Sequence, residues 1–262
     1  MIDLEKTLTN TKALVLDVGD FIRQESSNFS VSDIEHKGFN DLVSYVDKSA
    51  EEKLVAGCAT ILPQAGFIAE EGTSNKTGDT YNWIIDPLDG TTNFTHGLPV
   101  YAISLALMQD NEVILGIVYE INRDECFYAI KGQRAFLNDQ EIAVSKAQHL
   151  SESLLATGFP YYDFDQMNIY LQILNDFMQK THGLRRMGSA AVDLAYVACG
   201  RFEGFFEYNL NAWDVAAGAF IVQQAGGKVT DFKGGSDYIF GREIMAACSI
   251  HQEMLNVIQN RW

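Results

Sequence analysis

The chain has 262 residues, of which 47% are apolar and 21% charged; this fits one large α/β unit or two fused halves and excludes a disordered chain. Its formal net charge of −16 would repel the anionic phosphates of nucleic acids and the anionic lipids of membranes. We therefore expect neither nucleic acid nor a membrane as partner. The four cysteines are scattered and form no C-x-x-C pair, which predicts reduced thiols. The chain has no leader-like N-terminus and no run of about 18 apolar residues, which predicts a cytoplasmic protein.

The N-terminal part of the chain carries two stretches with helical periodicity. Apolar side chains recur at near-helical spacing over residues 4–22 and again over residues 50–62, where the pattern stops before Pro63. Asp47 falls near the N-cap of the second predicted helix. Between the two helices, residues 26–40 are polar and read as a loop.

Short apolar runs follow, and two of them end in acids. Residues 66–69 lead into Glu70 and residues 81–85 lead into Asp86, and both runs read as strands. Because the two strands end alike, their acids could converge. Residues 101–144 then alternate apolar segments with turn residues, which predicts an antiparallel meander without a crossover helix.

The C-terminal part alternates helices and strands. The predicted helices cover 167–178, 190–199 and 213–225 and a last segment at the end of the chain, and the predicted strands cover 202–208, 228–232 and 244–248. We therefore expect an α+β half over about residues 1–150 and an α/β half over about 151–262. No linker separates them, so we expect the two halves to share one core.

The segment that begins at Asp86 holds two carboxylates three residues apart. A tight turn is one explanation, because Asp, Pro and Gly are common residues in turns. However, Asp86 follows the apolar residues 83–85, where a bare carboxylate is costly, and a metal ion would offset that cost. Asp86, Asp89 and the Leu88 carbonyl suit magnesium, whereas zinc would favour His or Cys, and His96 has no partner histidine nearby.

Two further acidic segments are ambiguous when each is taken alone. Glu70 and Glu71 fit a solvated loop as well as a metal site. Trp213 and Asp214 fit an N-cap and a core aromatic, although the small residues 216–219 would allow close packing at a site and a helix N-terminus favours anions.

Taken together, these segments resemble the inositol monophosphatase family in motif, order and spacing. The matching residues are Asp47, 66–71, 86–94 and 213–218, and the resemblance runs from Lys37 to at least Gly227. It implies a layered αβαβα sandwich of the sugar phosphatase type, with residues 1–262 forming a single phosphatase domain. It also implies a homodimer and sensitivity to lithium.

The resemblance implies a hydrolase with two to three Mg²⁺ ions in the active site. Glu70, Asp86 and the Leu88 carbonyl would hold the first ion. Asp86, Asp89 and Asp214 would hold the second, and Glu70 would help to bind a weaker third.

The remaining roles implied by the resemblance concern water and substrate. Asp47, Thr91 and Glu70 would be the catalytic residues, orienting a metal-activated water that attacks without a covalent intermediate. Lys37 matches a lysine in a mobile loop of the family. The substrate-binding positions would be Gly90, Thr91, Thr92, Gly188, Ser189, Ala190, Glu207 and Asp214.

The expected substrate is a small phosphate monoester. Glu207 can accept hydrogen bonds from ring hydroxyls, which favours inositol monophosphate. A second phosphate would need a basic anchor such as Arg185 or Arg186, but these could equally form structural ion pairs. NADP(H) 2′-phosphate, fructose 1,6-bisphosphate and 3′-phosphoadenosine 5′-phosphate therefore remain alternative substrates. A regulatory binding protein with incidental activity remains an alternative function.

Overall fold

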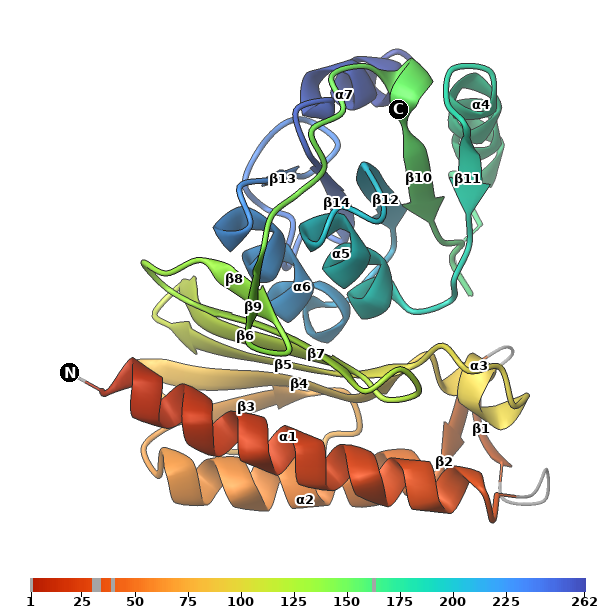
Figure 1. Ribbon diagram of the computed structural model, residues 1–262. Helices are drawn as coiled ribbons and strands as arrows, with labels where there is room; N and C mark the ends of the chain where they lie inside the picture. Colours follow the sequence, from red (N-terminus) through yellow and green to blue (C-terminus); the bar gives the residue numbers. More distant parts are fainter. Residues whose placement is uncertain (1, 30–33, 39–40, 162–163) are drawn as a thin grey trace.

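The protein folds into five alternating layers of helices and sheets (Figure 1). The computed structural model describes residues 2–29, 34–38, 41–161 and 164–262, and within 34–43 it describes the backbone alone. One helical pair covers the outer face of a seven-stranded sheet, a second pair lies between that sheet and a five-stranded sheet, and a third covers the far face (Figure 1). The predicted αβαβα sandwich is confirmed.

The first layer consists of α1, Leu4–Ser26, and α2, Tyr45–Ile61. The helix α1 buries one stripe that includes Val15, Val18 and Ile22, at the spacing of one helical face. The helix α1 continues beyond its predicted end because its last turn is polar, and α2 begins earlier than predicted, since buried Val46 extends the apolar stripe by one turn.

The predicted loop over residues 26–40 is wrong in one part. There, β1, Ile34–Gly38, pairs antiparallel with β2, Asp41–Ser44. This pair is short and mostly polar, so the apolar alternation that reveals longer strands is missing from the sequence. Lys37 lies in β1, but its side chain is outside the described part of the structure.

The seven-stranded sheet has the order β3-β4-β5-β6-β7-β8-β9. Its strands β3 and β4 are parallel and all other neighbours are antiparallel, so the predicted meander is confirmed. The strands are Gly66–Ala69, Tyr81–Asp89, Ala102–Gln109, Glu112–Glu120, Glu125–Ile130, Ala135–Leu137 and Gln140–Ile142.

The strand β4 runs beyond its predicted end and contains a bulge. Asp86 pairs with Ser104 and Asp89 with Ala102, so one extra residue is inserted on β4. In a regular strand, residues three apart point to opposite faces. The extra residue, next to Pro87, lets both aspartates turn toward the same side.

The five-stranded sheet has the order β11-β10-β12-β14-β13 and is mixed. Its strands β10, β11 and β12 are parallel, and β14 pairs antiparallel with β12 and β13. The strands are Leu154–Thr157, Gly183–Arg185, Gly204–Tyr208, Lys228–Thr230 and Glu243–Ala247. The three-residue β11 is too short to have shown a pattern in the sequence.

The remaining helices include the central layer, which positions the site. This layer consists of α5, Ala190–Ala198, and α6, Ala212–Gln224. The outer layer consists of α4, Met167–Met178, and α7, His251–Gln259, while α3, Thr91–Thr95, follows β4. No helix in the described ranges combines the length and apolarity needed to cross a bilayer.

The central helices approach closely at Gly218. A Cβ atom there would lie 2.6 Å from the Leu194 Cβ, near the backbone of α5. At Gly57 of α2, a new Cβ would instead meet the Leu14 side chain at 2.5 Å, mainly through its terminal methyl groups.

We expect Gly218→Ala to destabilise the protein by about 1–3 kcal/mol, because overpacking at a rigid contact outweighs the helix propensity that alanine adds. The matched change Gly57→Ala should be nearly neutral, since Leu14 can rotate away. Denaturant unfolding of both variants measures the difference. Equal stability of the two variants would contradict the close packing of α5 on α6.

Candidate active site

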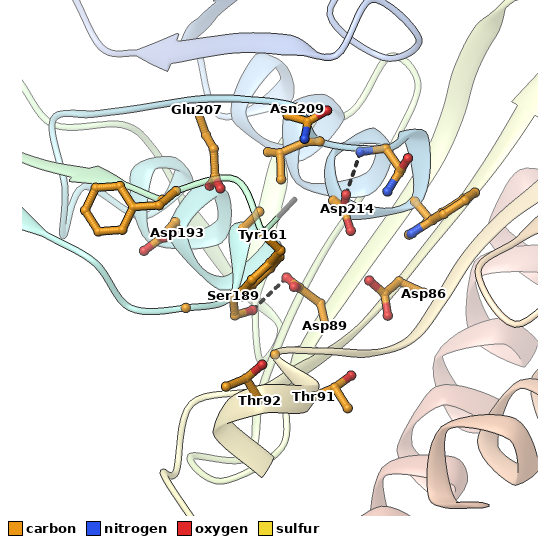
Figure 2. A pocket seen from close by; sticks show the side chains of 18 of the residues that line it. Asp86, Asp89, Thr91, Thr92, Tyr161, Ser189, Asp193, Glu207, Asn209 and Asp214 are labelled. Atoms are coloured by element: carbon orange, nitrogen blue, oxygen red, sulfur yellow. Dashed lines mark hydrogen bonds between the residues drawn. The ribbon is translucent and has the colours of Figure 1, made fainter. Parts of the chain in front are cut away.

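A cavity of about 340 Å³ opens where the end of β4 meets the N-termini of α5 and α6 (Figure 2). Its lining is unusually acidic, with one guanidinium, that of Arg186. The lining carboxylates are Glu70, Asp86, Asp89, Asp193, Glu207 and Asp214. Neither His nor Cys is among the lining residues that the structure describes.

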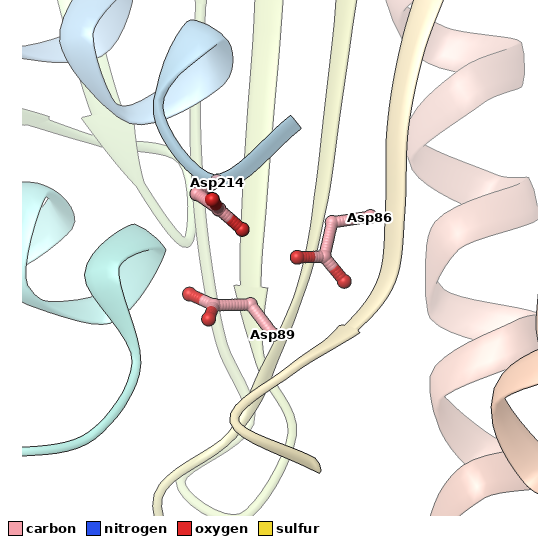
Figure 3. A group of neighbouring side chains, drawn as sticks. All are labelled: Asp86, Asp89 and Asp214. Carbon is pink, nitrogen blue, oxygen red and sulfur yellow. The ribbon is translucent and has the colours of Figure 1, made fainter. Parts of the chain in front are cut away.

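Three aspartates converge at the centre of this cavity (Figure 3). Asp86 and Asp89 come from the bulged end of β4, and Asp214 comes from the first turn of α6. Oxygen atoms of the three carboxylates lie within 4.8 Å of one another. Carboxylates this close repel each other unless a proton or a cation lies between them. We call this group the aspartate triad.

The pKa values of the aspartate triad are all raised, first of all by burial. Burial raises the pKa of Asp86 well above its usual range, and the charges of Glu70, Asp89 and Asp214 raise it further. Burial also raises the pKa of Asp89 to about 6 and, together with the charge of Asp89, that of Asp214 to about 7. Without a cation, the deprotonated aspartate triad is costly.

Hydrogen bonds hold Asp86 and Asp89 in place. The Leu88 amide donates to Asp86 Oδ1 at 2.9 Å. The Ser189 hydroxyl and the Ala191 amide both donate to Asp89 Oδ2, at 2.7 and 2.6 Å. Ser189 is the N-cap of α5, so the second half of the chain directly fixes a carboxylate of the first.

Asp214 is fixed by the cap of its own helix. The backbone amide of Asn211, the N-cap of α6, donates to Asp214 Oδ2 at 2.6 Å. Arg242 in turn donates to Asn211 Oδ1 at 3.0 Å and to Asn209 Oδ1 at 2.6 Å. Arg242 and Asn209 have φ values of 66° and 67°, a left-handed conformation that these mutual hydrogen bonds help to stabilise.

Glu70 lies beside the aspartate triad without belonging to it. The parallel pairing of β3 and β4 sets Glu70 next to the end of β4, and its amide donates to the Ile85 carbonyl at 3.3 Å. The side chain lines the cavity and its charge acts on Asp86. The two strands that end in acids therefore do converge.

Thr91 and Asp47 form a hydrogen-bonded pair at the edge of the cavity. The Thr91 hydroxyl lies 2.8 Å from Asp47 Oδ1 and 3.1 Å from the Leu88 carbonyl. The amide and hydroxyl of Ser44 both donate to Asp47 Oδ2, at 2.8 and 2.6 Å, so a capping box holds the carboxylate. Burial raises the pKa of Asp47. Asp47 is at N3 of α2, and Ser44 is the N-cap.

Glu207 lies on β12 at another part of the cavity lining. A Cβ atom at Gly158 would lie 2.1 Å from Glu207 Oε2, so the absence of a side chain at Gly158 makes room for the carboxylate. Burial raises the pKa of Glu207 to about 8, and the charge of Asp214 contributes. Gly90, Thr92, Gly188 and Ala190 line the same cavity. Of the two candidate anchors for a second phosphate, Arg186 lines it and Arg185 does not.

Several cavity residues were not predicted from the sequence. Asp193 of α5, Tyr161 and Asn209 all line the cavity. One signal was available for Asp193, since it is the one acid in the otherwise apolar helix Ala190–Ala198. Tyr161 and Asn209 lie in connecting segments, where no periodicity marks a residue.

The family model described as the inositol monophosphatase family matches residues 3–261. The chain belongs to the inositol monophosphatase family. Members of this family are generally metal-dependent, and the aspartate triad fits a metal site. Family membership supports phosphatase activity.

Relatives of the chain carry two kinds of name. A putative Nus factor SuhB from Neisseria meningitidis serogroup B is 45% identical, covering 92% of this chain and 93% of the relative. An inositol-1-monophosphatase from Rhizobium meliloti is 43% identical, covering 86% of this chain and 82% of the relative.

Solved structures of relatives share the fold. SuhB from Bartonella henselae superposes with a TM-score of 0.91 at 36% identity, covering 97% of this chain and 98% of that chain. An IMPase from Thermotoga maritima superposes with a TM-score of 0.85 at 36% identity, covering 95% of this chain and 94% of that chain.

We expect Thr91→Val to lower the free energy of unfolding by about 1–3 kcal/mol, because the buried Asp47 carboxylate loses a hydrogen-bond donor. Thr91→Ser keeps the hydroxyl and should retain most of the stability. Chemical denaturation in the presence of a chelator measures this effect apart from any metal. If valine and serine behave alike, the Thr91–Asp47 hydrogen bond is not the stabilising contact.

Proposed function

We propose that the protein is a magnesium-dependent phosphatase that hydrolyses a small phosphate monoester, with inositol monophosphate as the favoured substrate. The observation that carries this proposal is the aspartate triad, whose oxygens converge within 4.8 Å in a cavity shared by both halves of the chain. Because each half supplies part of the site, we also propose that residues 1–262 act as one phosphatase domain.

The donor set of the cavity fits magnesium. We assign the metal ligands to Glu70, Asp86, Asp89, Asp214 and the carbonyl of Leu88, for two to three ions. All are oxygen donors, which hard divalent cations prefer, while zinc sites usually include nitrogen or sulfur. Bound magnesium would neutralise charge on the phosphoryl oxygens and acidify a water molecule for attack.

Asp47 and Thr91 would hold the attacking water. The Thr91 hydroxyl donates a hydrogen bond to Asp47 Oδ1, which leaves its oxygen able to accept a hydrogen bond from the water. Glu70, which also lines the cavity, would complete the orientation of this water. Because water is the nucleophile, no side chain needs to form a covalent phosphoenzyme.

The phosphate and the alcohol would contact different parts of the lining. We assign the phosphate to the backbone of Gly90, Thr91 and Thr92, which lie beside the β4 carboxylates. We assign the alcohol to Glu207, with further substrate contacts at Gly188, Ser189, Ala190 and Asp214. The hydroxyl of Ser189 already donates to Asp89, so Ser189 would also position a metal ligand.

Other substrates make different demands on the same cavity. NADP(H) 2′-phosphate, fructose 1,6-bisphosphate and 3′-phosphoadenosine 5′-phosphate each carry at least one further phosphate. Arg186 is the one cationic side chain among the lining residues described, and its guanidinium donates to the Tyr161 hydroxyl at 3.0 Å. We therefore rank these substrates below inositol monophosphate. The homodimer and lithium sensitivity remain proposals that rest on the family.

A second candidate function comes from the relatives named Nus factor SuhB, one of which is 45% identical. The protein would then act through a macromolecular partner, and the exclusion of nucleic acid drawn from net charge remains a prediction. Phosphate release assays over the four substrates separate the two candidates. Absence of turnover on all four, with a specific partner bound to the intact protein, would favour this second function.

We expect Asp89→Asn and Asp214→Asn each to lower magnesium-dependent phosphate release from inositol 1-phosphate by more than about 100-fold, since even residues behind metal ligands cost 10–100-fold. Circular dichroism should show that both variants remain folded. The control Glu120→Gln changes another buried carboxylate, one that does not line the cavity, and should keep its activity. Retained turnover with unchanged magnesium dependence in either aspartate variant would refute the metal assignment.

A further inference from the structure

The cavity contains one more buried carboxylate than the proposed mechanism uses. Asp193 lies in the first turn of α5, is 1% exposed and lines the cavity. Its Oδ1 atom finds no hydrogen-bond partner among the described residues. In the view of Figure 2, Asp193 and Glu207 lie on one side of the cavity and Asp86 on the other, with Asp89 between them.

The proposed metal ligands account for all of the lining carboxylates except those of Asp193 and Glu207. Four of the six lining carboxylates, those of Glu70, Asp86, Asp89 and Asp214, are the ones assigned above to the metal ions. Burial raises the pKa of Asp193 well above its usual range, and the charge of Glu207 raises it further. A buried carboxylate oxygen without a partner is costly. A donor from a ligand would offset that cost.

The same cavity also offers unpartnered donors. Asn209 Nδ2 and Trp213 Nε1 are buried, belong to lining residues and have no hydrogen-bond partner in the described structure. The cavity therefore has both a hydrogen-bond acceptor and hydrogen-bond donors without partners among the described residues. A hydroxyl group donates one hydrogen bond and accepts two, so several hydroxyls on one ligand can satisfy both kinds. A phosphate at this position would mainly accept and would leave Asp193 unpaired, and an apolar group would satisfy neither kind.

We propose that Asp193 is a specificity-determining residue that, together with Glu207, accepts hydroxyl donors from the alcohol part of the substrate. Asp193 would then contribute to binding only when the alcohol presents a hydroxyl to it, so its removal should affect a polyol substrate and spare an alcohol without hydroxyls. This inference rests on the proposed phosphatase function and adds one residue to its contacts with the alcohol.

Two substrates that differ in their hydroxyl groups test the role of Asp193. Inositol 1-phosphate has the ring hydroxyls, and cyclohexyl phosphate has the same ring without them. In the magnesium-loaded protein, we expect Asp193→Asn to raise KM for inositol 1-phosphate by roughly 10- to 100-fold with a smaller change in kcat, which is the scale of an unsatisfied polar contact. The kcat/KM for cyclohexyl phosphate should change by less than about 3-fold.

Two controls separate specificity from stability. Glu120→Gln removes charge from a buried carboxylate outside the cavity lining and should change neither substrate's kinetics. Calorimetric titration gives a second readout. Asp193→Asn should weaken the binding of free inositol, titrated with inorganic phosphate present, and should leave the binding of inorganic phosphate, titrated by itself, unchanged.

The outcomes distinguish this inference from the function on which it rests. Equal losses on both substrates, or no loss on either, would overturn the role of Asp193 while the phosphatase proposal stands. The same holds if the unmodified protein hydrolyses cyclohexyl phosphate as well as inositol 1-phosphate. If the unmodified protein hydrolyses neither substrate, both proposals fail.

Discussion

The repulsion among the buried carboxylates of Asp86, Asp89 and Asp214 is the constraint on which the rest of the site depends. Their oxygens lie within 4.8 Å of one another, and burial raises all three pKa values. Hydrophobic residues would pack such a position at lower cost, so the arrangement makes physical sense when a cation is present. The surrounding structure holds the carboxylates in place by hydrogen bonds from Ser189 and from backbone amides, which keep them together despite their mutual repulsion.

The residues that hold these carboxylates come from both halves of the chain, so the two halves must pack against each other to form the site. The bulge in β4 turns Asp86 and Asp89 to one side, while the caps of α5 and α6 bring Ser189 and Asp214 to meet them. The central helices can reach this position because Gly218 allows close packing against α5. Small rearrangements in the central layer would therefore move the site as well as the core.

Much of the fold and part of the site could be predicted from the sequence. Helical and strand periodicity, together with the family resemblance, predicted the layers, and the residues around Asp86 marked the site because acids directly follow apolar strands. The strands β1, β2, β10 and β11 have three to five residues each, too few to show such a pattern, so they were missed. The β4 bulge and the Gly158–Glu207 contact depend on pairing between distant segments, which one sequence does not reveal. Asp193 was missed because an acid on a helix is ordinarily exposed to solvent.

Thermal unfolding of the intact protein and of Asp214→Asn, each in magnesium and in a chelator, shows whether a cation relieves the repulsion within the aspartate triad. Magnesium should raise the Tm of the unmodified protein by several degrees, about the effect of saturating a ligand at 100 times its Kd. In the chelator, Asp214→Asn should melt at or above the temperature of the unmodified protein, because one repelling charge is gone, and magnesium should then have little effect. A Tm of the unmodified protein that does not respond to magnesium, or an equal response in both proteins, would contradict the account.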